Sequence, residues 1–137
     1  DLSLALELAN AADAVTVPRF RATGLTVETK PDRSPVSEAD RRAEQVMRAL
    51  LDRERPGDGI LGEEYGAGPD AERRWILDPI DGTINYLRGI PVWGTLIALE
   101  QAGEIVAGVV SAPLLGRRWW ASRAGGAFGA RAPRRSP

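Results

Sequence analysis

The stretch that most constrains this chain is WILDPIDGTINY, residues 75–86. Its apolar residues 75–77 predict a short buried strand, and Asp78 follows directly. Pro79 fixes its own φ angle and holds Asp78 extended, whereas Gly82 permits a sharp turn. The chain must therefore leave this strand through a stiff, curled loop that carries two carboxylates.

The segments around this stretch predict two helices followed mainly by strands. Residues 2–21 have helical apolar spacing, and Ser37 with Asp40 indicates a capping box that opens a helix through about residue 54. Residues 83–89 predict one or two helical turns. The expected strands are 25–30, 60–65, 75–77, 92–100, 104–113, 117–122 and 125–130. This order predicts a single domain of the α+β class, with a mainly antiparallel sheet.

The chain of 137 residues contains neither cysteine nor histidine. Disulfides, cysteine-based zinc sites and histidine bases are therefore excluded, and acid–base or metal chemistry must come from carboxylates, which favour Mg²⁺, Mn²⁺ or Ca²⁺. With 18 basic and 19 acidic residues, the net charge gives no reason to expect nucleic acid or a membrane as a partner. The absence of cysteine and of a transmembrane run fits a cytoplasmic location.

The curled loop offers a candidate metal and phosphate site. A tight curl can bring the side chains of Asp78 and Asp81 together with the Ile80 carbonyl, three hard oxygens suited to a divalent ion. Gly82 and Thr83 would then present backbone N–H groups to a phosphate, and the Thr83 hydroxyl could orient a water. The alternative is structural, because Asp-Pro and Asp-Gly are common turn pairs and an aspartate can cap the following helix.

Other charged residues are ambiguous when taken alone. Glu63 and Glu64 follow a predicted strand, where an acidic pair usually belongs to a solvated loop. Asp40 is most simply a carboxylate favoured by the dipole at a helix start. Lys30, before a proline-rich loop, is by default an exposed side chain.

Together these segments resemble the signature of the inositol monophosphatase superfamily, Mg²⁺-dependent and lithium-sensitive phosphatases of sugar and polyol phosphates. Residues 75–86 fit every position of its pattern, and the GEE at 62–64 and the S-x-x-D element ending at Asp40 occur in the family order. Within the superfamily, the nearer likeness is to the histidinol-phosphate phosphatase branch of actinobacteria, on the RRWWA at 117–121 that follows a VSAP strand end. The resemblance runs over nearly all of the chain.

The resemblance implies roles for the acidic residues. Glu63 would bind the first metal, Asp78 would bridge two metals, and the Ile80 carbonyl and Asp81 would complete this half of the shell. The implied cofactor is Mg²⁺, as two or three ions, with Mn²⁺ possible. Glu64 follows the first ligand and would support it from behind.

The resemblance also implies how the reaction would be assisted. Thr83, paired with Asp40, would position and deprotonate the attacking water. The N–H groups of Gly82 and Thr83 would hold the phosphate. Lys30 would lie on a mobile loop that bears on the third metal.

The implied fold is the five-layered α-β-α-β-α fold, whose members are about twice this length. Residues 1–137 would be the N-terminal metal-binding part, with the sheet face that the other half covers left open, and an intact parent would be a homodimer. The implied activity is that of a phosphoric monoester hydrolase acting on a small-molecule phosphomonoester, with L-histidinol phosphate expected. Two alternatives remain: an inositol-1-phosphate or related sugar-phosphate phosphatase, and a truncated, non-catalytic metal-binding fragment.

Overall fold

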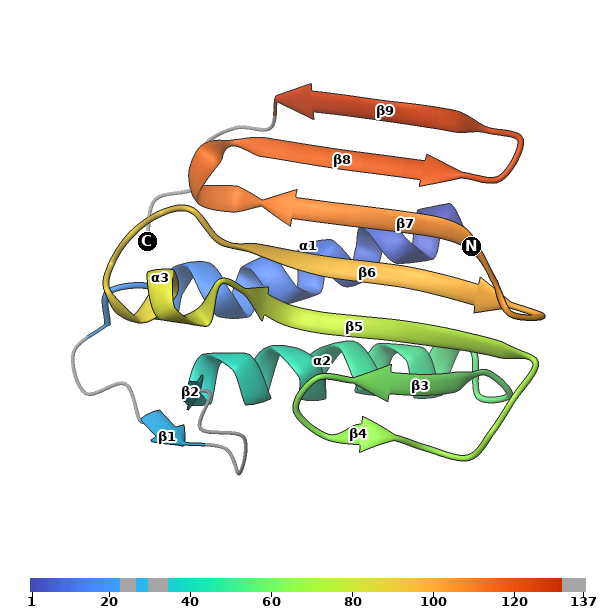
Figure 1. Ribbon diagram of the computed structural model, residues 1–137, viewed down its shortest axis with the longest axis horizontal. Coiled ribbons are helices and arrows are strands. Elements are labelled where there is room, and N and C mark those ends of the chain that lie inside the picture. Colours follow the sequence, from blue (N-terminus) through green and yellow to red (C-terminus); the bar gives the residue numbers. More distant parts are fainter. Residues whose placement is uncertain (23–26, 30–34, 132–137) are drawn as a thin grey trace.

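The structure, a computed structural model, describes residues 1–22, 27–29 and 35–131. Within these ranges, one sheet has the strand order β4-β3-β5-β6-β7-β8-β9, and two long helices pack on one of its faces (Figure 1). The strands are β3 (Gly59–Gly62), β4 (Gly66–Ala67), β5 (Arg73–Asp81), β6 (Gly94–Gln101), β7 (Glu104–Ala112), β8 (Arg117–Ser122) and β9 (Gly126–Arg131). The predicted α+β class is confirmed.

The sheet is mixed, because β3 runs parallel to β5 whereas the other neighbouring strands are antiparallel. A small separate ladder pairs β1 (Val27–Thr29) with β2 (Pro35–Ser37). The strand predicted at 25–30 is thus found at 27–29, and its other residues lie outside the described ones. The turns predicted at 83–89 form the short helix α3 (Thr83–Leu87).

The two long helices form the layer behind the sheet (Figure 1). Helix α1 (Leu2–Arg19) ends two residues before its predicted end, because Pro18 lacks an N–H and Phe20 is already extended. Helix α2 (Glu38–Glu54) begins at the predicted capping box of Ser37 and Asp40. Helix α2 has an apolar face, with four positions buried and two packed against the core: Ala39, Ala43, Met47 and Leu51, then Val46 and Leu50. In the described parts of the chain, no helix has the length and apolar character needed to cross a membrane.

Strand β5 is longer than the 75–77 expected from its apolar residues. It continues to Asp81, because β6 pairs with it on both sides of a register shift, at Asp78 opposite Leu96 and at Asp81 opposite Gly94. The shift contains Pro79, which has no N–H to give to a ladder, and the Thr95 hydroxyl donates to the Pro79 carbonyl at 2.8 Å. The curl predicted after the strand is therefore a bulge within it.

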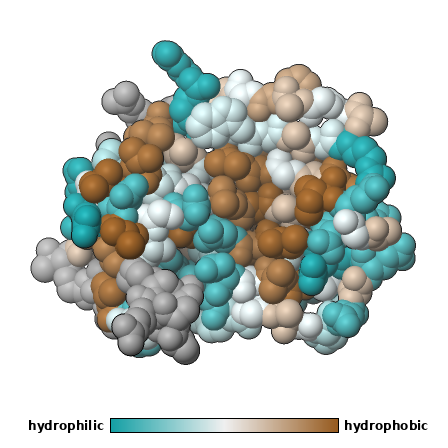
Figure 2. Space-filling model, viewed as in Figure 1, coloured by the Kyte–Doolittle hydropathy of each residue, from teal (hydrophilic) through white to brown (hydrophobic). Residues whose placement is uncertain are grey.

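Alternating side chains give the sheet two different faces. On the helix side, Trp75, Leu77 and Ile97 are buried in the main core. The opposite face carries an apolar hollow of about 750 Å³, visible as the brown region across the middle of Figure 2. Val110 and Trp119 line it and remain 37% and 40% exposed, so the open face expected from the sequence is present among the described residues.

This open face predicts self-association of the isolated chain, because large contiguous apolar patches drive contact between molecules. We expect the chain to bind a hydrophobic dye such as ANS and to elute above its monomer mass, and Val110→Lys to reduce both signals. Ile105→Lys, an equally drastic change at an exposed site on the same strand outside the hollow, is the control. A monodisperse monomer that binds no dye would contradict the prediction.

Candidate active site

The parallel pairing of β3 and β5 brings two acidic segments together. Gly62 lies opposite Leu77, and the next residue, Glu63, donates its N–H to the Leu77 carbonyl at 3.0 Å. Glu63 is therefore held at the end of β3, beside the point where Asp78 continues β5. Two sequence-predicted site residues, 15 positions apart in the chain, thus lie close together where two adjacent strands run side by side.

Gly82 turns the chain from β5 into α3. Its φ of 89° and ψ of 40° are left-handed, as the sharp turn predicted at this position requires. A Cβ here would also lie 3.3 Å from the Val92 carbonyl oxygen. The turn makes Thr83 the first residue of α3, two residues after Asp81, and Tyr86 donates its N–H back to the Gly82 carbonyl at 3.0 Å.

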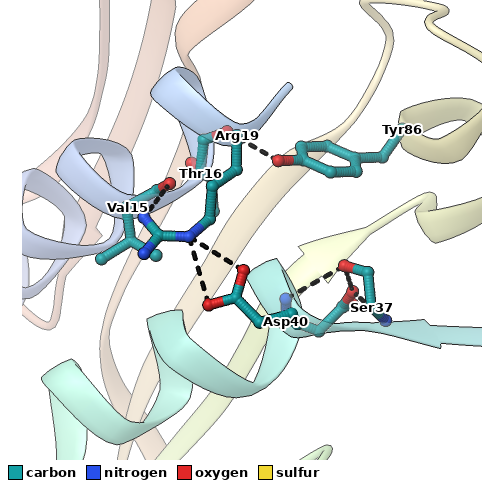
Figure 3. Close-up of polar contacts among 7 residues, drawn as sticks. Val15, Thr16, Arg19, Ser37, Asp40 and Tyr86 are labelled. Atoms are coloured by element: carbon teal, nitrogen blue, oxygen red, sulfur yellow. Dashed lines mark hydrogen bonds and ion pairs between the residues drawn. The ribbon is translucent and has the colours of Figure 1, made fainter. Parts of the chain in front are cut away.

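Asp40 and Thr83 are in contact although they lie 43 positions apart. Thr83 Oγ1 is 3.0 Å from Asp40 Oδ1, whereas Asp40 Oδ2 accepts from the Ser37 N–H at 2.9 Å and from the Ser37 hydroxyl. Asp40 is fully buried, and Figure 3 shows it beside Ser37 at the start of α2. The capping box therefore fixes one carboxylate oxygen and leaves the other facing Thr83.

The Thr83 hydroxyl has two acceptors within reach and only one proton. Its oxygen lies 3.0 Å from Asp40 Oδ1 and 3.0 Å from the Ile80 carbonyl oxygen. A cation drawing on the Ile80 carbonyl would favour donation to Asp40, because the carbonyl lone pair would then be engaged. The hydroxyl lone pairs of Thr83 would remain available to a water.

Helix α3 is anchored to α1 by an aromatic cluster. Tyr86 donates its hydroxyl to the Thr16 carbonyl at 2.7 Å (Figure 3), and Phe20, Tyr86 and Trp93 pack with ring centroids 4.9 to 5.7 Å apart. Burial, with a contribution from Asp40, raises the pKa of Tyr86 above its ordinary value, so its hydroxyl remains a donor. These contacts fix α3 against α1, and the contact of Thr83 with Asp40 joins it to α2.

Asp78 is surrounded by other acidic side chains. Burial is the largest cause, and Asp81, Glu63, Asp40 and Glu64 add to it in that order; together they raise the pKa of Asp78 from an ordinary 3.8 to about 7. Carboxylates crowded in this way repel one another and are commonly stabilised by a cation. All five belong to the candidate site predicted from the sequence.

The site residues fit a hard divalent cation in their chemistry, since they offer carboxylate oxygens and the Ile80 carbonyl. Among the described residues, no three carboxylates are already arranged as a ligand set for a metal. The assignment of Glu63, Asp78, Ile80 and Asp81 as ligands therefore stays a prediction.

The raised pKa of Asp78 predicts a pH dependence of stability. The folded state holds this proton at higher pH than the unfolded chain, so this contribution is fully present below about pH 4 and is lost as pH rises through about 7. Without added metal, the free energy of unfolding of the wild type minus that of Asp78→Asn should therefore fall between pH 4 and 7. Urea denaturation across this range measures it, and a constant or rising difference would contradict the assignment.

Two predicted residues have other outcomes. Lys30 lies outside the described residues, so its expected place near the site is not tested. Glu64 lies next to Glu63, and its N–H donates to the side chain of Glu44 at 2.8 Å. Sequence reasoning missed Glu44; the available signal was its place four residues after Asp40, on the same face of α2.

Comparison with known proteins shows the family of the chain. Residues 2–135 match the inositol monophosphatase family. The chain is 59% identical over 132 residues to a histidinol-phosphatase of Streptomyces coelicolor, covering 93% of this chain and 50% of that protein. It is 49% identical over 106 residues to an inositol-1-monophosphatase of Mesorhizobium japonicum, covering 76% of this chain and 40% of that protein.

Solved structures agree on the fold. The extragenic suppressor protein suhB of Bartonella henselae superposes with a TM-score of 0.88 at 38% identity, over 95% of this chain and 52% of that one. The chain thus spans about half the length of the curated relatives it matches. The match to this family over residues 2–135 shows that the chain belongs to the inositol monophosphatase family.

Proposed function

We propose that this chain is the metal-binding part of a Mg²⁺-dependent phosphomonoesterase, and that its substrate is L-histidinol phosphate. The observation that carries the proposal is that Glu63, Asp78 and the Thr83–Asp40 pair lie close together near the ends of strands β3 and β5. The 59% identity to a histidinol-phosphatase supports this substrate over inositol 1-phosphate.

The metal site would use Glu63, Asp78, Asp81 and the Ile80 carbonyl. When bound, Mg²⁺ would neutralise phosphate charge and lower the pKa of a nearby water, and Mn²⁺ has similar ligand preferences. The chain's own contribution is to hold these oxygens at the ends of two adjacent strands, β3 and β5, and on the bulge within β5. Two or three ions remain the prediction from the resemblance.

The Thr83–Asp40 pair would prepare the water. With its own proton directed to Asp40 Oδ1, Thr83 Oγ1 can accept a hydrogen bond from a water and then its proton, as Asp40 takes the hydroxyl proton. The water oxygen forms the new bond to phosphorus while the bond to the alcohol oxygen breaks, and the departing alcohol oxygen takes a proton from solvent water. The backbone N–H groups of Gly82 and Thr83 are the predicted phosphate contacts, at the start of a helix too short for its dipole to contribute much.

Phosphate release tests the proposal directly. L-Histidinol phosphate and inositol 1-phosphate are compared with Mg²⁺ and with a chelator, using this chain and a longer chain that adds the second half found in its relatives. We expect chelator-sensitive release from the longer chain, faster with L-histidinol phosphate. If neither chain releases phosphate from either substrate, the proposal is contradicted.

One alternative is favoured by a specific observation. The 49% identity to an inositol-1-monophosphatase keeps inositol 1-phosphate as the second candidate substrate, and faster release from it would select that branch. Release only by the longer chain would mean that residues 1–137 are a metal-binding part without turnover of their own. A homodimeric parent and a cytoplasmic location stay predictions.

A further inference from the structure

A buried carboxylate outside the predicted site holds the loop that carries Glu63. Glu44 lies on α2 and is fully buried. Burial of a charged group is costly unless strong hydrogen bonds compensate for the lost water. The partners of Glu44 therefore indicate why a carboxylate stands at this position.

Glu44 receives hydrogen bonds from the loop after β3. The N–H of Glu64 donates to Oε1 at 2.8 Å, and the N–H of Tyr65 donates to Oε2 at 2.9 Å. Arg48, one turn further along α2, donates to Oε2 at 2.9 Å and reaches the Gly66 carbonyl at 2.6 Å with its other nitrogen. Helix α2 thus grips three consecutive residues directly after Glu63.

The residue before Glu63 is shaped for the same contact. A Cβ on Gly62 would overlap the carboxylate of Glu44, so only glycine lets the helix carboxylate come this close to the strand. Glu63 itself is tied by its N–H to the Leu77 carbonyl on the other side. Strand β5 therefore holds the backbone of Glu63 itself, and Glu44 holds the two residues that follow it.

We propose that Glu44 is a positioning residue that sets the Glu63 carboxylate beside Asp78 for metal binding. The inference rests on the proposed function. Asp40 and Glu44 lie one helical turn apart on α2, where Asp40 orients Thr83 and Glu44 orients the loop of Glu63. A single helix face therefore sets the relative position of the water-orienting and the metal-binding parts of the site.

Glu44→Gln tests this role, because an amide cannot accept from both loop N–H groups with its two ends. Mn²⁺ binding to the chain, followed by electron paramagnetic resonance, should weaken about 10–100-fold, as for loss of an outer-shell partner of a metal ligand. Hydrogen exchange of the Glu64 and Tyr65 amides should also accelerate. Both readouts are independent of turnover.

Two controls separate positioning from general stability. Glu54→Gln makes the same chemical change at a partly exposed ion pair near the end of α2. Leu51→Val loosens the buried face of the same helix without touching the loop. Both variants should bind Mn²⁺ as the wild type does, whereas a role of Glu44 in helix stability alone would make Leu51→Val weaken binding as well.

The outcomes are distinct. Wild-type Mn²⁺ affinity in Glu44→Gln would overturn the proposal. If the wild-type chain binds no Mn²⁺, the proposed metal function of this chain fails and amide exchange decides the role of Glu44. Faster exchange at Glu64 and Tyr65 would then support its hold on the loop, and unchanged exchange would overturn it.

Discussion

Replacement of Asp81 by asparagine is expected to reduce Mg²⁺-dependent phosphate release more than about 100-fold, beyond what loss of an outer-shell partner usually costs. Asp81 is the last residue of β5, lies opposite Gly94 and is exposed. The substitution keeps the size of the side chain and removes the charge that a hard cation requires. Activity should therefore be lost without loss of the core.

The same substitution should leave the metal-free fold intact or slightly stabilise it. Asp81 is the charged neighbour that most raises the pKa of Asp78, so its neutralisation relieves repulsion between two carboxylates. Thermal unfolding without metal measures the change in stability. Phosphate release, by this chain or the longer one if only that is active, measures the loss of activity. Asp52→Asn, at an exposed position of α2, is the matched control.

Retained Mg²⁺-dependent turnover in Asp81→Asn would remove this residue from the metal site. A large drop in the unfolding temperature without metal would contradict the repulsion argument instead. The two results can be separated, because turnover is measured with Mg²⁺ and the unfolding temperature is measured without metal.

Local sequence predicted the site best where neighbouring residues determine the backbone. The capping box of Ser37 and Asp40 and the left-handed turn at Gly82 follow from residue types at fixed spacing, and both are found. The strands predicted at 92–100 and 104–113 are found as β6 and β7, which form an antiparallel hairpin. Its turn uses Ala102 at a φ of 51°, which residue type alone does not predict.

Pairing between distant strands was not predictable in the same way. Apolar residues indicated a strand at 75–77, but the extension of β5 to Asp81 depends on β6 crossing its bulge. The parallel pairing of β3 with β5 places Glu63 next to Asp78, and no local pattern in the sequence indicates this pairing. Glu44 shares a helix face with Asp40, but its partners lie 20 and 21 positions away, so its role did not follow from its neighbours in the sequence.

Removal of the Thr83 hydroxyl should lower turnover ~10²–10⁴-fold, the usual contribution of a positioned acid–base group. Thr83→Ala deletes the oxygen that faces Asp40 Oδ1 and the Ile80 carbonyl. Thr83→Ser keeps that oxygen and should retain most of the activity. A similar loss in both variants would show that the methyl group matters and not the hydroxyl.

Asp40→Asn tests whether Thr83 and Asp40 act as a pair. If the asparagine oxygen replaces Oδ2 in accepting from Ser37, its NH₂ group faces Thr83 and forces the hydroxyl to donate to the Ile80 carbonyl. The direction of the Thr83 proton is then reversed, and turnover should fall by an amount similar to that in Thr83→Ala. The double variant should lose little more than either single one, because groups that act as a unit are strongly non-additive. Losses that multiply in the double variant would mean that Asp40 serves α2 as a cap and that Thr83 orients the water without it.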